Sequence, residues 1–494
     1  MNARPLHAPS GIENGIISPN MRKLALYVFL GFLSFGANAG AQSSPLPVIP
    51  GAQGYGMQTR AAYGGATLPT IYRIRNLNDR GSGSLRAAME ASVPRVVIFE
   101  ISGYIDLADM IRITSPYITV AGQTAPSPGI TLRKYGIEIQ THDVLLQHFR
   151  VRPGEWGQNK VDNCGIIAWG AAAHDIVLDH MSVSWGPDEN IAADTYFKGD
   201  MNMTVWRSIS AEGLDFPASV PLSASHGLLV QANSRKVYIA QSLLASNRER
   251  NPYAQSGTSL AAVNNLIYNW FANWSFFFAN DTPSGDPGGT PWAATVVGNR
   301  LVPGPNTADD SDSPQGWLFY YDDTGGTPFG NQIYRRDNTV DNTLQISIEI
   351  EGNELSYDPN TASPPALAPI DGIVPLASDT VEELVLANAG ARPADRDEVD
   401  RRIVYQVSTR TSDGYIRSQT EVGDYPPLAV NRRGLTLPAA PHSITGSGYT
   451  TLEVWLHSFS TAVERSAQPS VATSLPMGDM VEREYRRPVG QRSN

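Results

Sequence analysis

The sequence predicts an all-β chain folded as a parallel β-helix, and three observations lead to that prediction. A nine-residue pattern of alternating apolar residues around a polar residue returns six times. The copies are unevenly spaced, whereas propellers and leucine-rich repeats keep tighter periods. Only 17% of the residues are charged, and 44 Gly and 36 Pro favour short strands and many turns. A β-sandwich with unevenly spaced strands is the alternative fold.

The repeated pattern fixes where the solenoid should lie. Three earlier segments, at 96–107, 117–123 and 130–140, have the composition of N-terminal rungs. We therefore expect one β-helix domain over 46–345. The six copies of the pattern lie at 143–151, 175–183, 202–210, 236–244, 259–267 and 293–301.

Residues 1–41 have the features of an upstream segment and an export signal. Met21-Arg-Lys supplies positive charge, 24–35 are apolar, and small residues allow cleavage near Ala39 or Ala41. The apolar run is too short for a confident membrane span. We expect a secreted protein, extracellular or periplasmic, that has no membrane association after cleavage.

Composition limits the partners and the means of stabilisation. The single cysteine, Cys164, excludes an internal disulfide framework, so stability must come from packing. A formal net charge of -11 and an isoelectric point near 5.3 argue against nucleic acid as a partner. A capped solenoid needs no second copy, so we expect a monomer.

The composition changes after about residue 340. Residues 346–378 are rich in Pro, Ala and Ser and are expected to form a linker or a loop wrapped on the solenoid. We expect 379–465 to form a cap or subdomain of short helices and 466–494 to be a flexible tail. Amphipathic helices are expected at 379–388, 396–410 and 450–463.

Four histidines flank two copies of the pattern. His142 and His148 bracket the first copy, and His174 and His180 bracket the second. If each pair lies on one side of a strand, four imidazoles meet and bind a transition metal. The alternative, which we favour, is that they form ladders of polar side chains between stacked rungs.

Acidic residues gather around the second copy. Asp162 precedes it, and Asp188 and Glu189 follow it. Carboxylates brought together by stacking repel one another unless they are protonated or bridged by a hard cation such as Ca²⁺. A solvated acidic face is the alternative.

The stretch NRERNP, 247–252, follows directly from the pattern at 236–244. Arg250 should lie at the edge of that rung, where Pro252 fixes a turn. The alternative is that Arg250 is a surface charge, which is the ordinary role of an arginine near the end of a strand.

Several motifs in order resemble one family. SGSLRAAM (82–89), YITVAGQTAPSPGITL (117–132), DIVLDHMSVSWGPDE (175–189) and the segment 247–270 together are similar to the exported bacterial pectate lyases. The tail segments 389–404 and 448–459 look like those of one large branch of that family. The resemblance spans about 46–460.

That resemblance implies a right-handed parallel β-helix that cleaves polygalacturonate by β-elimination beside bound Ca²⁺. It implies that Arg250 takes the C5 proton and that Pro252 belongs to the same Arg-x-Pro-x-x-Arg motif. The second arginine of the motif falls on Gln255, and His226 stands where the family commonly has a lysine. Arg248 is at most a helper; with His226 it would lower the pKa of Arg250, which Glu249 would raise.

The calcium site implied by the resemblance carries over in part. Asp162 matches the first aspartate of an Asp-x-Asp-Ala-Ile pattern, but Cys164 replaces the second. Asp188 matches an acidic position whose partner is Ala192, and Glu189 is the residue expected to compensate.

Two other functions stay open. The replacements at Cys164, Ala192, His226 and Gln255 leave room for a noncatalytic carbohydrate-binding β-helix. A β-helix glycoside hydrolase needs carboxyl groups on both sides of the scissile bond, and the chain lacks the polygalacturonase-like NTD, DD, GHG and RIK series.

Overall fold

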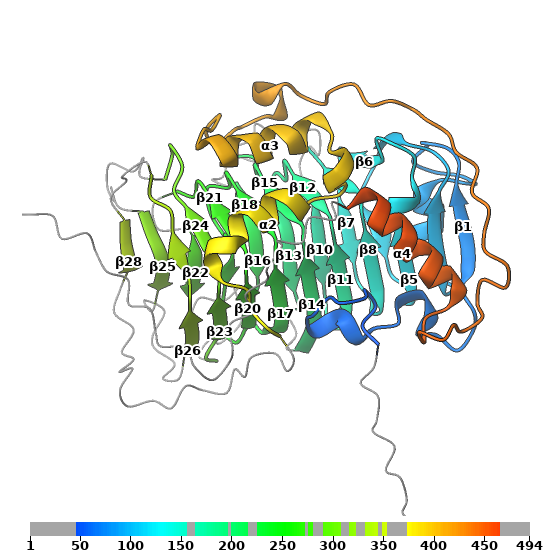
Figure 1. Cartoon of the computed structure of the whole chain (residues 1–494), viewed down its shortest axis with the longest axis horizontal. Helices are drawn as coiled ribbons and strands as arrows, with labels where there is room; N and C mark the ends of the chain where they lie inside the picture. Colours follow the sequence, from blue (N-terminus) through cyan, green and yellow to red (C-terminus); the bar gives the residue numbers. More distant parts are fainter. Residues whose placement is uncertain are drawn as a thin grey trace, which may run out of the picture. The chain divides into compact units, whose positions relative to one another are not determined.

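A computed structural model describes residues 46–155, 164–195, 199–215, 225–271, 275–279, 290–307, 316–322, 331–343, 348–352 and 373–464. The strands in these ranges pair in parallel in three sheets, and the chain visits the sheets in turn (Figure 1). The predicted all-β parallel β-helix is therefore confirmed. No helix within the described ranges has the length and apolarity of a membrane span.

The first sheet consists of β1 (Thr70–Ile74), β2 (Arg95–Phe99), β5 (Ile118–Ala121), β8 (Val144–Gln147), β11 (Ile176–Asp179), β14 (Gly199–Trp206), β17 (Ser234–Ala240), β20 (Ser259–Val263), β23 (Ala293–Val297) and β26 (Gln332–Arg336). The second sheet consists of β4 (Ile111–Ile113), β7 (Ile137–Ile139), β10 (Ile166–Trp169), β13 (Glu189–Asp194), β16 (His226–Val230), β19 (Tyr253–Ala254), β22 (Phe276–Ala279), β25 (Gly316–Asp322) and β28 (Ile348–Gly352). The third sheet consists of β3 (Gly103–Asp106), β6 (Ile130–Arg133), β9 (Arg150–Arg152), β12 (Ser182–Ser184), β15 (Ile209–Ala211), β18 (Leu243–Ala245), β21 (Leu266–Tyr268), β24 (Arg300–Val302) and β27 (Thr339–Val340).

Each copy of the nine-residue pattern is a corner rather than one strand. The copy at 143–151 contains β8, a bend and the start of β9. The sixth residue of every copy has a positive φ, which turns the chain from the first sheet to the third. Asn and Gly tolerate this conformation best, and the other copies use polar residues. These corner residues are His148, His180, Arg207, Gln241, Asn264 and Gly298.

The core lies inside the solenoid and is built from stacked apolar residues. Val144, Ile176 and Met203 occupy equivalent positions on β8, β11 and β14, and all three are fully buried. α1 (Leu85–Met89) closes the N-terminal end, because Leu85 and Met89 enter the same core. Short 3₁₀ helices occur at η1 (Tyr55–Gln58), η2 (Ala61–Tyr63), η3 (Gly122–Thr124), η4 (Ser378–Thr380), η5 (Pro393–Asp395) and η6 (Gln419–Val422).

The C-terminal helices pack on two of the three sheets (Figure 1). α2 (Val381–Asn388) and α3 (Glu398–Thr409) bury Val385 and Ile403 against residues of β15, β18 and β21. α4 (Thr451–Val463) buries Leu452 and Leu456 against residues of β2 and β5. The three amphipathic segments predicted from the sequence thus form helices near the expected limits.

One predicted boundary differs from the structure. The sequence predicts a linker or a loop wrapped on the solenoid from residue 346 to 378, but β28 pairs with β25 and extends the second sheet into this segment. The alternation in Ile348-Glu-Ile-Glu is that of a strand. The predicted signal, at 1–41, and the predicted tail, at 466–494, lie outside the described residues.

Candidate active site

Successive rungs of the second sheet bring three predicted site residues together. Glu189 and His226 begin β13 and β16 and occupy paired positions. His226 in turn pairs with Glu249 in an isolated bridge of the next rung. Arg250 follows at the corner before β19, in the left-handed region with φ 64°. Residues separated by up to 61 positions in the chain therefore form one cluster.

The guanidinium of Arg250 is held by a carboxylate and an aromatic ring. Its Nη1 makes an ion pair with Oε1 of Glu189, and its Cζ lies 5.5 Å from the centre of the Tyr253 ring. Burial lowers the pKa of Arg250, but Glu189, Asp188 and Glu249 outweigh this, so the pKa is raised above its ordinary value. The sequence leaves the direction open, since Arg248 and His226 would lower the pKa and Glu249 would raise it; the structure adds two carboxylates from another rung, and the raising effect prevails.

His226 lies among the same carboxylates and is 5% exposed. Its Nδ1 is 3.4 Å from Oδ1 of Asp188 and 3.6 Å from Oε1 of Glu189, and its Nε2 is 3.7 Å from Oε2 of Glu249. Burial and the charge of Arg250 lower the pKa of His226 to about 3, although Glu189 opposes them. The ring is therefore neutral near pH 7, where a lysine would be charged.

Arg248 and Arg250 have different nearest partners, although both interact with Glu249. Its Nη1 lies 3.5 Å from Oδ1 of Asp215, and its Cζ lies 4.5 Å above the ring of Phe271. The two arginines of the NRERNP stretch are thus not equivalent.

Pro252 and Gln255 lie on either side of β19. The Asn251–Pro252 peptide bond is cis, and the carbonyl of Pro252 accepts a hydrogen bond from the backbone of Phe277. Gln255 accepts a hydrogen bond from the backbone N–H of Ala232 through Oε1, at 3.0 Å. Its amide is therefore tied to the scaffold, at the position where the resemblance expects an arginine.

A second group near Arg250 contains possible metal ligands. Ligand atoms of Cys164, Asp188 and Glu189 all lie within 4.8 Å of one another. Burial and the charge of Asp188 raise the pKa of Glu189, although Arg250 and His226 oppose them. Burial and the same carboxylates raise the pKa of Cys164, so the thiol stays protonated.

The donor set fits a hard cation through its carboxylates. Oxygen atoms of Asp188 and Glu189 are suitable ligands for Ca²⁺, whereas a protonated thiol is not. A divalent cation would also relieve the repulsion between the two carboxylates. Asp162, the third predicted ligand, lies outside the described residues.

A buried asparagine network supports the corner that carries Arg250. Asn247 accepts hydrogen bonds from Asn190 Nδ2 and from the backbone N–H of Gly213, at 3.1 and 3.0 Å. It donates to the carbonyl of Ser210 and to Oδ1 of Asn251, each at 3.0 Å. Sequence reasoning missed these residues, because asparagines that come from two separate rungs carry no local motif.

The four-histidine metal site is not formed. The His142 ring stacks on His174, and the His148 ring stacks on His180, with centroids 4.7 Å apart in both pairs. The corner at His148 ends the strand, so the two members of a sequence pair do not share a sheet face. In the described part of the chain, neither His142 nor His174 belongs to a cluster of possible metal ligands.

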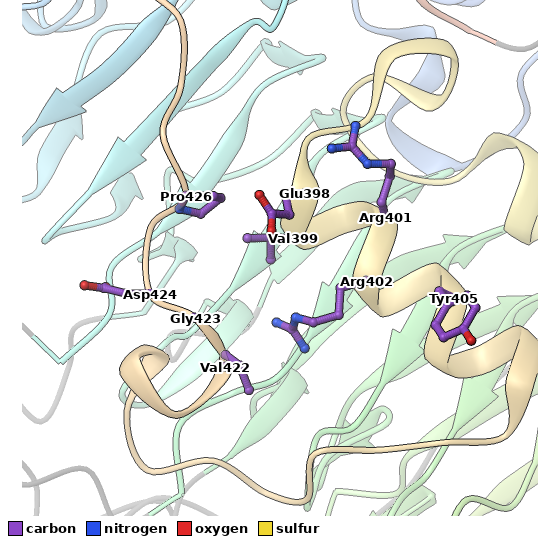
Figure 2. Close-up of a pocket in the computed structure, with 9 residues that line it drawn as sticks. All are labelled: Glu398, Val399, Arg401, Arg402, Tyr405, Val422, Gly423, Asp424 and Pro426. Atoms are coloured by element: carbon purple, nitrogen blue, oxygen red, sulfur yellow. The ribbon is translucent and has the colours of Figure 1, made fainter.

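The surface hollows do not mark the site. One of about 420 Å³ lies between α3 and the segment 422–426 (Figure 2). Its Arg402 is used structurally, because it forms an ion pair with Glu212. Three described hollows contain none of the predicted site residues, so the site rests on the side-chain cluster around Arg250.

Comparisons with known proteins agree with the sequence motifs. No protein-family model matches the chain. The probable pectate lyase C of Aspergillus flavus is 30% identical over 445 residues, covering 84% of this chain and 94% of that protein. The probable pectate lyase C of Aspergillus fumigatus is 30% identical over 442 residues, with the same coverage.

Solved structures were compared as well. The crystal structure of jun a 1, the major allergen from cedar pollen, is 14% identical and has a TM-score of 0.47, covering 68% of this chain and 91% of that one. The two relatives above are fungal, whereas the motifs resembled bacterial enzymes. Sequence identity over most of both chains shows that the chain belongs to the pectate lyase family, a family of polysaccharide lyases.

Proposed function

We propose that this protein cleaves pectate, or a related uronate polymer, by β-elimination, and that Arg250 removes the proton at C5. The observation that carries the proposal is the position of Arg250. It lies on a rigid corner beside the carboxylates of Asp188 and Glu189, in the segment that matches the family motif. The substrate would be an acidic polysaccharide bound by a protein monomer, and the leader at 1–41 would export it.

Removal of the C5 proton requires that negative charge be stabilised. The proton α to a carboxylate is only weakly acidic, and the electrons left behind move onto the carboxylate before the bond to O4 breaks. Asp188 and Glu189 would hold Ca²⁺, which when bound neutralises a neighbouring carboxylate and favours this charge. Neutral His226 adds no charge of its own and separates the carboxylates of neighbouring rungs.

The state of Arg250 sets a condition on the mechanism. Paired with Glu189 it is charged, and a charged guanidinium cannot accept a proton. Proton removal therefore requires that Glu189 leave Arg250 and contact another partner when substrate and Ca²⁺ are bound. The carboxylates near Arg250 would then be offset by a cation held by Asp188 and Glu189, and burial would lower the pKa of Arg250.

A panel of uronate polymers, assayed with and without Ca²⁺ by the ultraviolet absorbance of unsaturated products, tests the proposal. We expect absorbance with pectate, loss of activity in EDTA, and loss in Arg250→Ala. Arg250→Lys should be nearly as inactive, because a lysine lacks the planar fork of donors. Arg235→Ala, which removes an exposed arginine paired with Asp200, is the matched control.

Other outcomes would reject the proposal. Products with saturated non-reducing ends and no ultraviolet absorbance would favour a glycoside hydrolase. Saturable binding of pectate without turnover, with calcium supplied, would favour a noncatalytic carbohydrate-binding solenoid. Full activity of Arg250→Ala would remove that residue from the reaction.

A further inference from the structure

A buried cluster of nitrogen and oxygen donors lies where α4 ends on the β-helix. His148 and His180 occupy the corners after β8 and β11 and are 0% and 2% exposed. Asp179 lies beside them, and Glu464 follows the last turn of α4. The cluster does not depend on the proposed function, because none of its members belongs to the group around Arg250.

The donor atoms have the spacing of a metal site. His148 Nε2 lies 3.4 Å from Glu464 Oε1 and 3.9 Å from Asp179 Oδ2. His180 Nδ1 donates a hydrogen bond to Asp179 Oδ1 at 2.7 Å and lies 4.0 Å from Glu464 Oε1, so it would give up that proton on binding a cation. Donors at about 2.0 Å from a tetrahedral Zn²⁺ are separated by about 3.3 Å. The separations between the donor atoms of the cluster range from 2.7 to 4.0 Å, on both sides of this value.

The hydrogen bonds of His148 leave its other nitrogen available. Nδ1 lies 2.9 Å from the backbone carbonyl of Ala391, which can only accept, so Nδ1 carries the proton. Nε2 is buried, makes no hydrogen bond of good geometry in the described part of the chain, and lies 3.4 Å from Glu464 Oε1, so its lone pair is available to a cation whenever the ring is neutral. A second-shell carbonyl that orients the ring in this way is typical of metal-binding histidines.

The charges of the cluster also favour a cation. Within the described ranges, Asp179 and Glu464 form ion pairs with the two imidazoles, and the guanidinium of Arg207 acts on both carboxylates without a direct ion pair. Burial lowers the pKa of His180 although Asp179 opposes it, so the ring is neutral. The two carboxylates, one buried and one half-buried, outnumber the single guanidinium that acts on them in the described part of the chain, so the site favours an added cation.

We propose that His148, Asp179, His180 and Glu464 form a structural site for a transition metal of the Zn²⁺ type. Mixed nitrogen and carboxylate donors suit Zn²⁺ better than Ca²⁺. The site would fasten the end of α4 to the first sheet. The two rings stack with planes 14° from parallel, so binding both to one ion would tilt them toward each other. The side chain of Glu464 is 25% exposed. An ion would therefore enter the site past Glu464.

Metal analysis of the full-length protein tests the site. After growth with zinc and removal of loosely bound metal, we expect one Zn²⁺ per chain. His148→Ala and Glu464→Gln should lose it, and Glu464→Gln removes one charge at the end of a helix, where the fold should tolerate it. His174→Ala, from the other stacked pair, is the matched control and should keep the metal. Cobalt substitution should give the visible bands of a tetrahedral site.

Thermal unfolding provides a second measurement. A zinc chelator should lower the Tm of the wild type and of His174→Ala, but should leave that of Glu464→Gln unchanged. A calcium-selective chelator should leave the bound zinc in place. Wild-type protein without zinc would overturn the proposal and indicate a cluster held by ion pairs alone. Zinc retained by both His148→Ala and Glu464→Gln would overturn it equally.

Discussion

Glu189 Oε1 is ion-paired with Arg250 Nη1 across the intervening strand β16. The residue proposed to remove the proton and a residue proposed to bind Ca²⁺ therefore share one contact. A cation bound by Glu189 would therefore change the surroundings of Arg250. The metal site and the catalytic arginine should respond together to substitution.

Glu189→Gln tests this connection. A neutral amide is a weaker ligand for a hard cation, so the Ca²⁺ concentration for half-maximal rate should rise by about an order of magnitude or more. A calcium titration of the lyase rate measures it. Asp200→Asn, which changes an exposed carboxylate on β14, should leave the titration unchanged. Equal calcium dependence in wild type and Glu189→Gln would exclude Glu189 as a ligand.

Gly227 is needed because the backbone of the catalytic corner passes close to it. A Cβ at this position would lie 2.7 Å from the backbone oxygen of Arg250 and 2.7 Å from Asn247 Nδ2. Gly227→Ala should displace Arg250 and lower kcat by about a hundredfold, with the circular dichroism spectrum retained. At Gly199 a Cβ meets no atom within 4 Å, so Gly199→Ala should keep the wild-type rate. Wild-type kcat in Gly227→Ala would show that the corner tolerates movement.

Asn247 should act as a positioning residue. Asn247→Asp keeps the acceptor for Gly213 but loses the donors to Ser210 and Asn251. Each buried group left without a partner costs about 1–3 kcal/mol. We expect lower stability and, at temperatures where the variant is folded, a lower kcat with KM little changed.

A matched asparagine separates positioning from stability. Asn265 is buried away from the site, where it donates to the carbonyl of Ile239 and to Asn299. Asn265→Asp should be destabilised in a similar way but should retain kcat. Equal losses of kcat in both variants would mean that Asn247 has only a structural role.

Much of the fold could be predicted from the sequence because stacking repeats one local pattern. The apolar residues of each copy face the same core, so Val144 and Ile176 are recognisable without tertiary information. The corners were not predicted. A glycine would have signalled a positive φ, but His148 and Arg207 adopt a positive φ without being glycine. Nor does periodicity show that β28 continues the sheet after a change of composition.

The candidate site was less predictable than the fold. Motif spacing placed Arg250, but not its pairing with Glu189, which depends on the register of three rungs. The direction of the pKa shift of Arg250 could not be predicted for the same reason, because Arg248 and His226 would lower the pKa and Glu249 would raise it. Charges from other rungs decide it, and the neighbours in sequence contribute less. The asparagines that support the corner act only through tertiary contacts.

The junction between α3 and the β-helix should be sensitive to acid. Asp397 caps α3 and binds Arg152 through both oxygens, at 2.5 and 3.1 Å. Although burial opposes them, Arg150 and Arg152 hold the pKa of Asp397 well below its usual range. A depressed folded-state pKa stabilises the fold fully above the unfolded value of about 3.9, and this stability is lost as the pH falls below it.

Urea unfolding of wild type and Asp397→Asn between pH 3 and 7 measures this contribution. At pH 7 the variant should be less stable by about 1–3 kcal/mol, because the buried guanidinium of Arg152 loses its contacts with the Asp397 carboxylate and keeps only its pair with Asp400. Below about pH 4 the difference should shrink, by at most about 1.4 kcal/mol per pH unit, since the wild type then begins to lose the same charge. Asp395→Asn, whose carboxylate is 39% exposed and pairs with Arg392, should change stability little at any pH. A difference between wild type and Asp397→Asn that does not vary with pH would show that the hydrogen bonds of Asp397, rather than its charge, hold α3 in place.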